Sequence, residues 1–401
     1  MWLYFMHAII RLAGSFAFVL TFFMLICFLY GAYSFFRLKR TNLLDTIILV
    51  FMTYIFLNTI AIDYPHHINF LVFAFFFQVC PFMCYFIART NDLEFETVLK
   101  KMVVPITIIM VLGVYFHLAQ PEWYTALKWT VIYNRYGSQH ITDNHVIEHM
   151  RLSSIFDSSY YVAYATFFFS TYLLYALTFK ALQSNKQVLY VALLILCVVV
   201  LIFANHRSTI LGFIIAYLFC FVKGKNKAIR RYFVLGACVI AVIFIVIVFS
   251  SEEYLNYITM RFEGVTTKEG FQDRFDHTGG EQNLFTLFGE GFGRYSIRAR
   301  EYDGWALIDS QYQNILGELG IVGLTLFVII LVITAVEAFI NSNRVGLEFC
   351  VFLFYVVTFL GASALVIDSE YSFIFWYALG KINQKSSYST QKAPLALKSV
   401  V

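Results

Sequence analysis

A polar segment that leads into a long apolar run, Asp309–Tyr312, holds the residues best placed for chemistry. Gln311, Asn314 and Glu318 follow within the first turns of the run, together with several glycines. A helix that enters lipid rarely carries such groups, because each polar group must find a partner there. We therefore expect these three side chains to face a protein interior or a water-filled cavity.

Two carboxylates, Asp309 and Glu318, belong to this junction. A carboxylate within hydrogen-bond reach of a sugar hydroxyl can orient or deprotonate it, and we predict this catalytic role for Asp309. Asp309 is equally well suited to be only the N-cap of the following helix. Glu318 is either a second carboxylate of the site or a buried partner for an arginine. With Tyr312 it is a predicted substrate-binding residue.

Four arginines are candidate ligands for an anion, and all are expected on one face of a membrane: Arg151, Arg207, Arg274 and Arg294. Arg207 lies in a short turn between two strongly apolar runs, where a guanidinium costs desolvation energy unless it is paired. Its planar fork suits a phosphate better than an ammonium would. An arginine that merely reaches for the interface is the alternative. Converging arginines outside a membrane predict a lipid-linked pyrophosphate.

The segment 251–311 mixes carboxylates and arginines with aromatic residues. Charged groups bind hydroxyls and rings stack on sugar faces, so this mixture favours a saccharide; a solvated loop is the alternative. His145 and His149 could share one helical face, as a metal pair would need, but the sequence fixes no third ligand. We expect ordinary loop histidines and no metal or other cofactor.

The composition indicates the class of protein. Of 401 residues, 60% are hydrophobic, 19% aromatic and 13% charged, which is typical of a polytopic membrane protein. The seven cysteines lie within or beside apolar runs, so we interpret them as packing residues. The sequence contains no P-loop, so ATP-driven transport has no support, and no nucleic-acid partner is expected.

The predicted fold is all-α, a single transmembrane domain over residues 1–401 with about 11 membrane-spanning helices. Each predicted span approaches the roughly 20 mostly apolar residues needed to cross a bilayer, although the last is short. The predicted spans are 13–36, 43–62, 68–88, 102–119, 159–180, 188–204, 208–222, 232–250, 312–340, 347–367 and 369–380.

The orientation follows from lysine and arginine in alternating connections, because cytoplasmic loops carry the excess of these residues. The long segments 120–158 and 251–311 then lie on the outer face, where long loops are usually functional. The basic connections that define the cytoplasmic face are 37–40, 89–101, 180–186, 223–231 and 344, with residues 381–401 as a cytoplasmic tail.

Four segments between residues 150 and 330 resemble the O-antigen polymerase/ligase superfamily, most of all its polymerase branch. Their order, spacing and common side carry the resemblance. In ligases of this superfamily the junction usually begins with His, whereas here it begins with Asp309, which favours the polymerase branch. The segments are Arg151–Phe156 before a span, the turn Asn205–Thr209, the loop residues Gln272–Arg274 with the Gly-x-Gly-x-Gly element Gly289–Gly293, and the junction Asp309–Gly323.

The resemblance implies a helical fold similar to that of lipid-sugar-dependent, GT-C-type glycosyltransferases, in the inner (cytoplasmic) membrane. It implies a polysaccharide repeat-unit polymerase that transfers a glycan from undecaprenyl pyrophosphate to a sugar hydroxyl of another lipid-linked unit. Membrane lipid is then a partner, and a flippase and a chain-length regulator are further candidates. The product would be O-antigen lipopolysaccharide, capsule or exopolysaccharide. Arginines would neutralise the leaving pyrophosphate without a metal.

Two other functions remain open, an O-antigen ligase and a non-enzymatic transporter of lipid-linked oligosaccharide. A ligase is disfavoured by the absence of His at position 309. A transporter would need charged groups near the membrane midplane and repeat symmetry. The predicted spans between the loops are nearly free of charge and show no repeat.

The predicted topology can be tested with single cysteines at Gly280, Ser138 and Ser184, in a background without the native cysteines. Because the first two positions are predicted outside, a membrane-impermeant thiol reagent added to intact cells should label them and not Ser184→Cys. Labelling of Ser184→Cys from outside, or of only one of the two loop positions, would contradict the topology.

Overall fold

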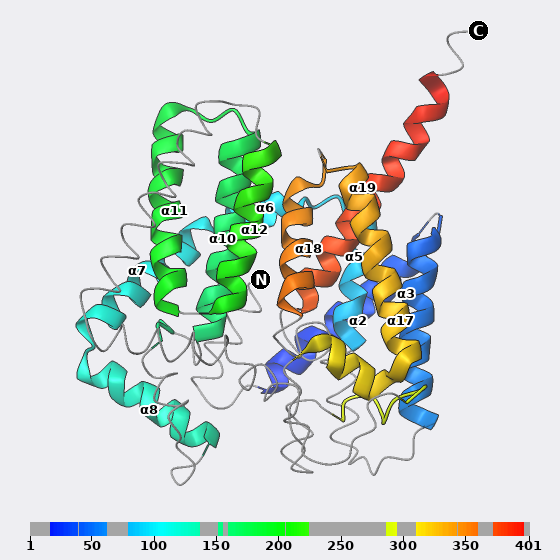
Figure 1. The fold of residues 1–401 in the computed structure, drawn as a ribbon, viewed down its shortest axis with the longest axis horizontal. Helices are drawn as coiled ribbons and strands as arrows, with labels where there is room; N and C mark the ends of the chain where they lie inside the picture. Colours follow the sequence, from blue (N-terminus) through cyan, green and yellow to red (C-terminus); the bar gives the residue numbers. More distant parts are fainter. Residues whose placement is uncertain are drawn as a thin grey trace, which may run out of the picture. The chain divides into compact units, whose positions relative to one another are not determined.

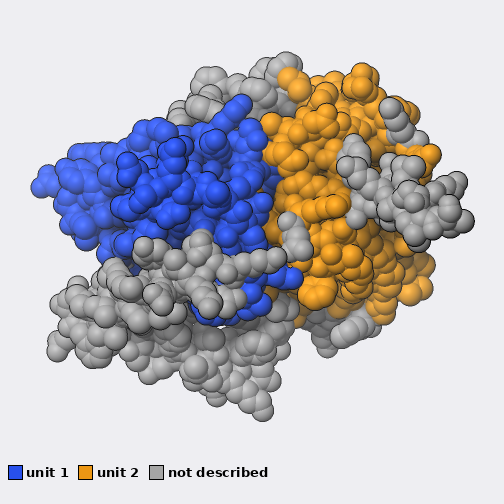
Figure 2. Space-filling view, turned by 90° about the horizontal axis from the view of Figure 1, so that it is seen from above, with its two compact units in different colours: residues 1–20, 95–251 blue, residues 21–94, 252–401 orange. Residues whose placement is uncertain are grey.

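The computed structural model describes most of the chain, and within the described ranges it is α-helical apart from turns and contains no strand. This confirms the all-α prediction. Two compact units are found, residues 1–20 with 95–251 and residues 21–94 with 252–401 (Figure 2). The prediction of a single transmembrane domain stays a prediction. The described residues are 17–38, 40–61, 79–136, 151–154, 159–204, 206–223, 286–294, 310–342, 344–359 and 372–396.

The first unit is built around α10 (Ser159–Phe179), which is buried along most of its length. Small and aromatic side chains let neighbours approach it closely, and two of its buried hydroxyls, those of Ser170 and Thr178, donate to carbonyls of the same helix at 2.8 and 2.7 Å. Figure 1 shows α11 and α12 beside it. The other helices of this unit are α6 (Phe95–Lys101), α7 (Val103–Ala119), α8 (Glu122–Tyr136), α11 (Ser184–Ala204) and α12 (Arg207–Lys223).

The second unit centres on α19 (Ser372–Ala396), which packs against α5 and α18, while α3 packs against α17 (Figure 1). Large aromatic side chains fill its core, among them Trp376 and Phe82, whose rings lie 4.3 Å apart. The other elements are α2 (Ala17–Phe36), α3 (Leu43–Ala61), the 3-10 turn η2 (Cys80–Phe82), α5 (Met83–Thr90), α17 (Gln311–Ile340) and α18 (Gly346–Thr358).

One end of the second unit holds a buried ionic network that begins at the cap of α3. Asn42 and Asp45 cap that helix reciprocally, with Asn42 N donating to Asp45 Oδ2 at 2.9 Å and Asp45 N to Asn42 Oδ1 at 3.0 Å. The fully buried Asp45 carboxylate also accepts both Nε and Nη2 of Arg89, at 3.0 and 2.9 Å. Two-pronged pairing of this kind is the geometry that can offset the desolvation of both charges.

Helix α19 brings further polar groups to this end, and it continues to Ala396, past the end at residue 380 that the sequence predicted. Lys381 is buried and donates to Asn91 O and Gln384 Oε1, and Lys385 lies 2.8 Å from both Glu348 and Glu94. Between residues 381 and 387, polar side chains of the helix therefore find partners inside the unit. Arg89, Lys381 and Lys385 thus lie at one end of this unit, and their predicted cytoplasmic location stays a prediction.

The opposite end of the second unit contains a break in α17. Gly320 has φ 67° and ψ −169°, far from helical values, so the helix changes direction there, as Figure 1 shows near its start. A break exposes the carbonyls that precede it and the amides that follow it. At membrane depth these groups must be satisfied by protein or water.

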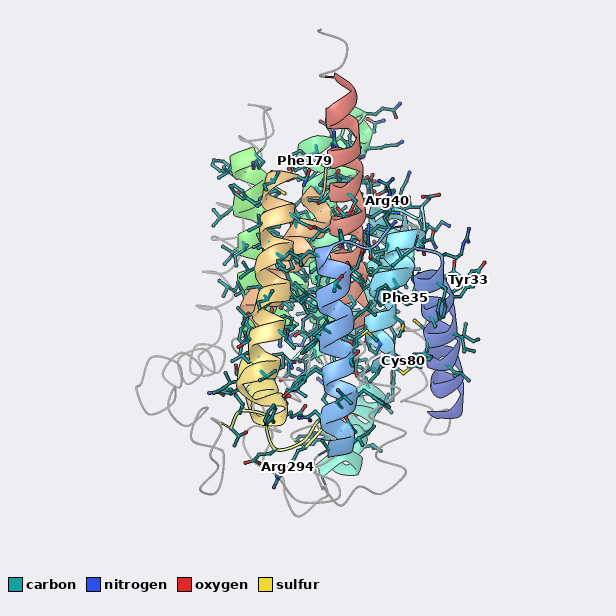
Figure 3. All side chains as sticks on the ribbon, turned by 90° about the vertical axis from the view of Figure 1, so that its right-hand side faces the viewer. Tyr33, Phe35, Arg40, Cys80, Phe179 and Arg294 are labelled. Carbon is teal, nitrogen blue, oxygen red and sulfur yellow. The ribbon has the colours of Figure 1, made fainter. Side chains whose placement is uncertain are left out.

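The glycine-rich loop, residues 286–294, supplies the missing partners. Glu290 N and Gly291 N donate to the carbonyls of Gly317 and Glu318, at 2.8 and 3.1 Å. In return, the amides of Ile321 and Val322 donate to Thr286 O and Leu287 O, at 3.1 and 3.2 Å. The loop and the broken helix therefore complete each other's backbone hydrogen bonds. In Figure 3 this end, marked by Arg294, lies opposite the end marked by Arg40.

The helices agree with many predicted spans. Four of the described helices, α3, α10, α11 and α17, are long and apolar enough to cross a membrane, and α6 with α7 would add a fifth across a bend of 49°. Shorter apolar helices cover Met24–Phe36, Ser208–Lys223 and Gly346–Thr358. The predicted span 232–250 lies outside the described residues. The count of about 11 spans and the GT-C resemblance are not confirmed and stay predictions.

Alanine at Gly289 or Gly320 should destabilise the second unit, because each glycine has positive φ and its added Cβ would lie 2.3 Å from Glu318 O or 2.4 Å from Gly289 N. We expect a cost of about 1–2 kcal/mol for the conformation and about 1–3 kcal/mol for the overlap. The measurement is the thermal midpoint of detergent-purified protein. Leu287→Ala, which removes an exposed side chain from the same loop, serves as the control. Midpoints unchanged from wild type would contradict the tight packing.

Candidate functional site

The segment Arg151–Ser154 is anchored to the helices of the first unit. Leu152 N donates to Phe203 O at 3.1 Å, near the end of α11, and Ser154 Oγ donates to Ile109 O of α7 at 2.8 Å. Lys128 Nζ from α8 donates to Arg151 O at 2.7 Å. These bonds hold Arg151 near the end of α11, close to the turn that leads into α12.

The guanidinium of Arg151 is buried, with only 7% of the residue exposed. Its Nε has no hydrogen-bond partner, and no acidic side chain among the described residues pairs with it. A buried donor without a partner is costly, so the Nε of Arg151 favours an anion that completes its hydrogen bonds.

His206 lies immediately before α12 and is also buried. Its ring packs against those of Tyr160 and Tyr164, with centroids 4.7 and 5.3 Å apart, and its Nδ1 lies 3.2 Å from Ser208 Oγ. Burial, and then the charge of Arg151, lower the pKa of His206 to about 3. The imidazole is therefore neutral at pH 7 and adds hydrogen-bonding capacity without charge.

Arg207 is the first residue of α12, next to His206. Its backbone therefore lies at a helix N-terminus, where unpaired amides and the helix dipole favour an anion. The bond from Leu152 N to Phe203 O brings the Arg151 segment to the turn that precedes Arg207. The Arg207 side chain lies outside the described residues, so its role as a phosphate ligand stays a prediction.

In the second unit, Arg294 ends the glycine-rich loop and pairs with Glu290. Arg294 Nη1 lies 3.1 Å from Glu290 Oε2, and each side chain is about one-fifth exposed. A pyrophosphate would have to compete with this carboxylate for the guanidinium. The ion pair also places a donor and an acceptor together, which is an arrangement that suits sugar hydroxyls.

The junction residues pack inside the second unit as predicted. Gln311, Asn314 and Glu318 are 0%, 3% and 1% exposed, which confirms that they face a protein interior. Tyr312 donates its hydroxyl to Val356 O of α18 at 3.1 Å and packs its ring against Phe327 and Phe359. These contacts give Tyr312 a packing role, and its contact with substrate stays a prediction.

Two predicted residues, Arg274 and Asp309, lie outside the described residues, as do most positions of the loops 120–158 and 251–311. Their chemical roles stay predictions, but the alternative of Asp309 as the N-cap is wrong, because Ser310 is the N-cap of α17. Within the described part of the chain, no three His, Cys, Asp or Glu side chains group as metal ligands would. Six of the seven cysteines are described, and all six are free thiols.

Sequence reasoning missed two residues, His206 and Asn58. His206 was assigned no role from the sequence, although its position between Asn205 and Arg207 was a signal. Asn58 of α3 bonds the glycine-rich loop through its side chain, as Phe292 N donates to its Oδ1 at 3.1 Å. A lone amide within a predicted span is itself a signal, because polar groups are costly there.

Comparison with protein families identifies one match. Residues 192–328, about a third of the chain, match the family described as O-antigen ligase. This range includes Arg207, Arg274, Arg294 and the junction from Asp309 to Gly323, but not Arg151. Over this range the match confirms the resemblance to the O-antigen polymerase/ligase superfamily. No curated protein was found to match the chain.

His206 should make stability depend on pH. Its pKa of about 3 lies below the ordinary 6.5, so only the unfolded chain takes up the proton as pH falls below 6.5. The stability from the neutral ring is complete above pH 6.5 and is lost as pH falls toward 3, by at most about 2 kcal/mol at pH 5. The thermal midpoint of His206→Gln should therefore change less between pH 7 and pH 5 than that of wild type. Parallel pH curves would exclude this account of His206.

Proposed function

We propose that this multi-pass membrane protein is a polysaccharide repeat-unit polymerase. It transfers a glycan from undecaprenyl pyrophosphate to a sugar hydroxyl of another lipid-linked unit, at the outer face of the inner membrane. The observation that carries the proposal is the buried Arg151, which has no acidic partner among the described residues. It supports a pyrophosphate ligand in a chain whose residues 192–328 match the O-antigen ligase family.

The proposed reaction is a substitution at the anomeric carbon of the donor glycan. The acceptor hydroxyl oxygen forms the new bond to that carbon, the bond to the phosphate oxygen breaks, and undecaprenyl pyrophosphate leaves with the electron pair. Arg151 and Arg207 stabilise the charge that develops on the leaving group, because cations act most strongly in a site shielded from water. The hydroxyl proton passes to a base, a role that we propose for Asp309.

In this proposal, the other predicted residues bind either the pyrophosphate of the donor or sugar hydroxyls, or form the wall of the site. Arg274 is a further proposed ligand of the pyrophosphate. Arg294 lies beside Glu290 and either yields to the pyrophosphate or, with Glu290, binds sugar hydroxyls. Glu318 is too buried, at 1% exposure, to meet an exposed acceptor, so we assign it to the wall of the site together with Tyr312. No cofactor is required, since no electron transfer or phosphorylation is involved.

An O-antigen ligase is the second candidate function, and the description of the matching family favours it. A ligase would use the same donor and leaving group but transfer the finished glycan to a different acceptor, a lipid-anchored core. Asp309 in place of the usual His supports the polymerase instead. In both cases the donor reaches the outer face through a flippase. A chain-length regulator is a partner only for the polymerase.

The product of the purified protein in lipid vesicles separates these functions. With undecaprenyl pyrophosphate-linked repeat units as the only glycan substrate, a polymerase should release undecaprenyl pyrophosphate and form a ladder of longer lipid-linked glycans. A ligase should form no ladder and should transfer the glycan only after a lipid-anchored core is added. No transfer under either condition, with folded protein in the vesicles, would overturn the proposal of a glycosyltransferase.

Arg151→Lys should lower the transfer rate about 10- to 100-fold, since charge is kept but the planar fork that binds two phosphate oxygens is lost. Arg37→Lys is the matched control, because Arg37 is exposed and lies 5.6 Å from the centre of the Tyr33 ring. The measurement is the initial rate of ladder formation at equal levels of folded protein. A normal rate for Arg151→Lys would remove Arg151 from the site.

A further inference from the structure

Within the glycine-rich loop, the turn Gly289–Gly291 is flanked by Phe288 and Phe292. Among the described side chains of α3, only that of Asn58 bonds both of these flanking residues. Its Nδ2 donates to Phe288 O at 2.6 Å, and its Oδ1 accepts from Phe292 N at 3.1 Å. These two backbone groups flank the segment Gly289–Gly291. The residue is only 5% exposed, so water does not compete freely for either bond.

A second residue of α3, one helical turn before Asn58, reaches the broken helix. Tyr54 donates its hydroxyl to Leu319 O at 2.6 Å, the carbonyl just before the break at Gly320. The side chains of α3 therefore contact both the loop and the break. Because the loop and the break are joined by four backbone bonds, these contacts fix three segments against one another.

Four of the six amides from Gly289 to Arg294 in the glycine-rich loop are occupied by protein groups. Those of Glu290 and Gly291 bond α17, that of Phe292 bonds Asn58, and that of Arg294 bonds Gly291 O at 3.3 Å. A glycine-rich loop that cradles phosphate needs amides directed at its ligand. We therefore assign this loop to the placement of side chains.

The side chains that the loop presents are Glu290 and Arg294, which lie on either side of the amide that Asn58 holds. Loss of the two Asn58 bonds would loosen the turn between them, which the bonds of Glu290 N and Gly291 N to α17 would still hold, without breaking the ion pair itself. Small displacements of a charged group at a transfer site are costly, since rate depends on geometry to within about 1 Å.

We propose that Asn58 is a positioning residue of the transfer reaction, and that it acts by clamping the glycine-rich loop to the break in α17. This inference rests on the proposed function of the site. It extends the site to α3, which lies outside the range that matches the O-antigen ligase family.

The test compares Asn58→Leu, which keeps the size and removes both bonds, with Asn58→Gln, which keeps both polar groups on a longer side chain. Thr59→Val is the matched control, because Thr59 lies next in the same helix and, among the described residues, its hydroxyl bonds only Ile55 O of its own helix, at 2.8 Å. Asn58→Gln provides a second variant in case Asn58→Leu fails to reach the membrane in folded form.

Two readouts are measured on each variant. The first is the initial rate of ladder formation in vesicles. The second is the rate at which a thiol reagent labels Thr286→Cys, in the background without native cysteines. Thr286 Oγ1 is buried and has no hydrogen-bond partner among the described residues, so a cysteine there reports the opening of the loop and not the activity.

Asn58→Leu should label about 10- to 100-fold faster, the change expected for the loss of two hydrogen bonds, and its transfer rate should fall by a similar factor. Asn58→Gln should fall between Asn58→Leu and wild type, and Thr59→Val should match wild type in both readouts. Unchanged labelling of Asn58→Leu would overturn the clamp. Faster labelling with an unchanged transfer rate would overturn the positioning role.

A wild-type protein that forms no ladder would overturn the proposed polymerase but not the clamp, which the labelling rates decide independently. An equal loss of transfer in Thr59→Val would show that α3 is merely sensitive to substitution, and this would also overturn the assignment of Asn58.

Discussion

The structure depends on one constraint, that backbone hydrogen-bonding groups at membrane depth must be satisfied within the protein. The break at Gly320, ten residues into α17, creates this need. The glycine-rich loop meets it by accepting from two amides and donating to two carbonyls. Hence the loop, the break and the face of α3 form one arrangement, and none of the three can be understood alone.

The opposite end of the second unit follows the same rule with charged side chains. Asp45 caps α3 and receives two bonds from Arg89, and Lys385 joins Glu348 and Glu94. Replacing one member would leave a buried charge without its partner, which is more costly than the pair is favourable. The unit is therefore rigid at both ends: one end is held by main-chain bonds and the other by ion pairs.

Much of the helical framework could be predicted from the sequence. The length of an apolar run indicates whether a helix can cross lipid, and polar residues within the run indicate which side faces protein. Burial of Gln311, Asn314 and Glu318 follows from that reasoning. The extension of α19 to Ala396 could not be predicted in this way, since its lysines resemble a cytoplasmic tail until their partners are known. The ion pair between Glu290 and Arg294 could not be predicted either, because the charge of an arginine does not show whether it binds a substrate or a neighbouring side chain. His206 and Asn58 were missed for the same reason: their roles come from contacts between distant segments.

The separation in the chain between Asn58 and its loop partner, 234 residues, has a consequence for biogenesis. During synthesis α3 leaves the ribosome and enters the membrane long before Phe292 exists, so the amide of Asn58 must spend that interval with other partners or with water. The side-chain amide of Asn58 therefore lacks its partners in the glycine-rich loop until the last third of the chain is made. A ribosome that stalls after Asn58 but before Phe292 would leave a chain whose α3 is inserted without its partners in the glycine-rich loop. Membrane proteases that remove incompletely folded proteins would be expected to degrade such a chain.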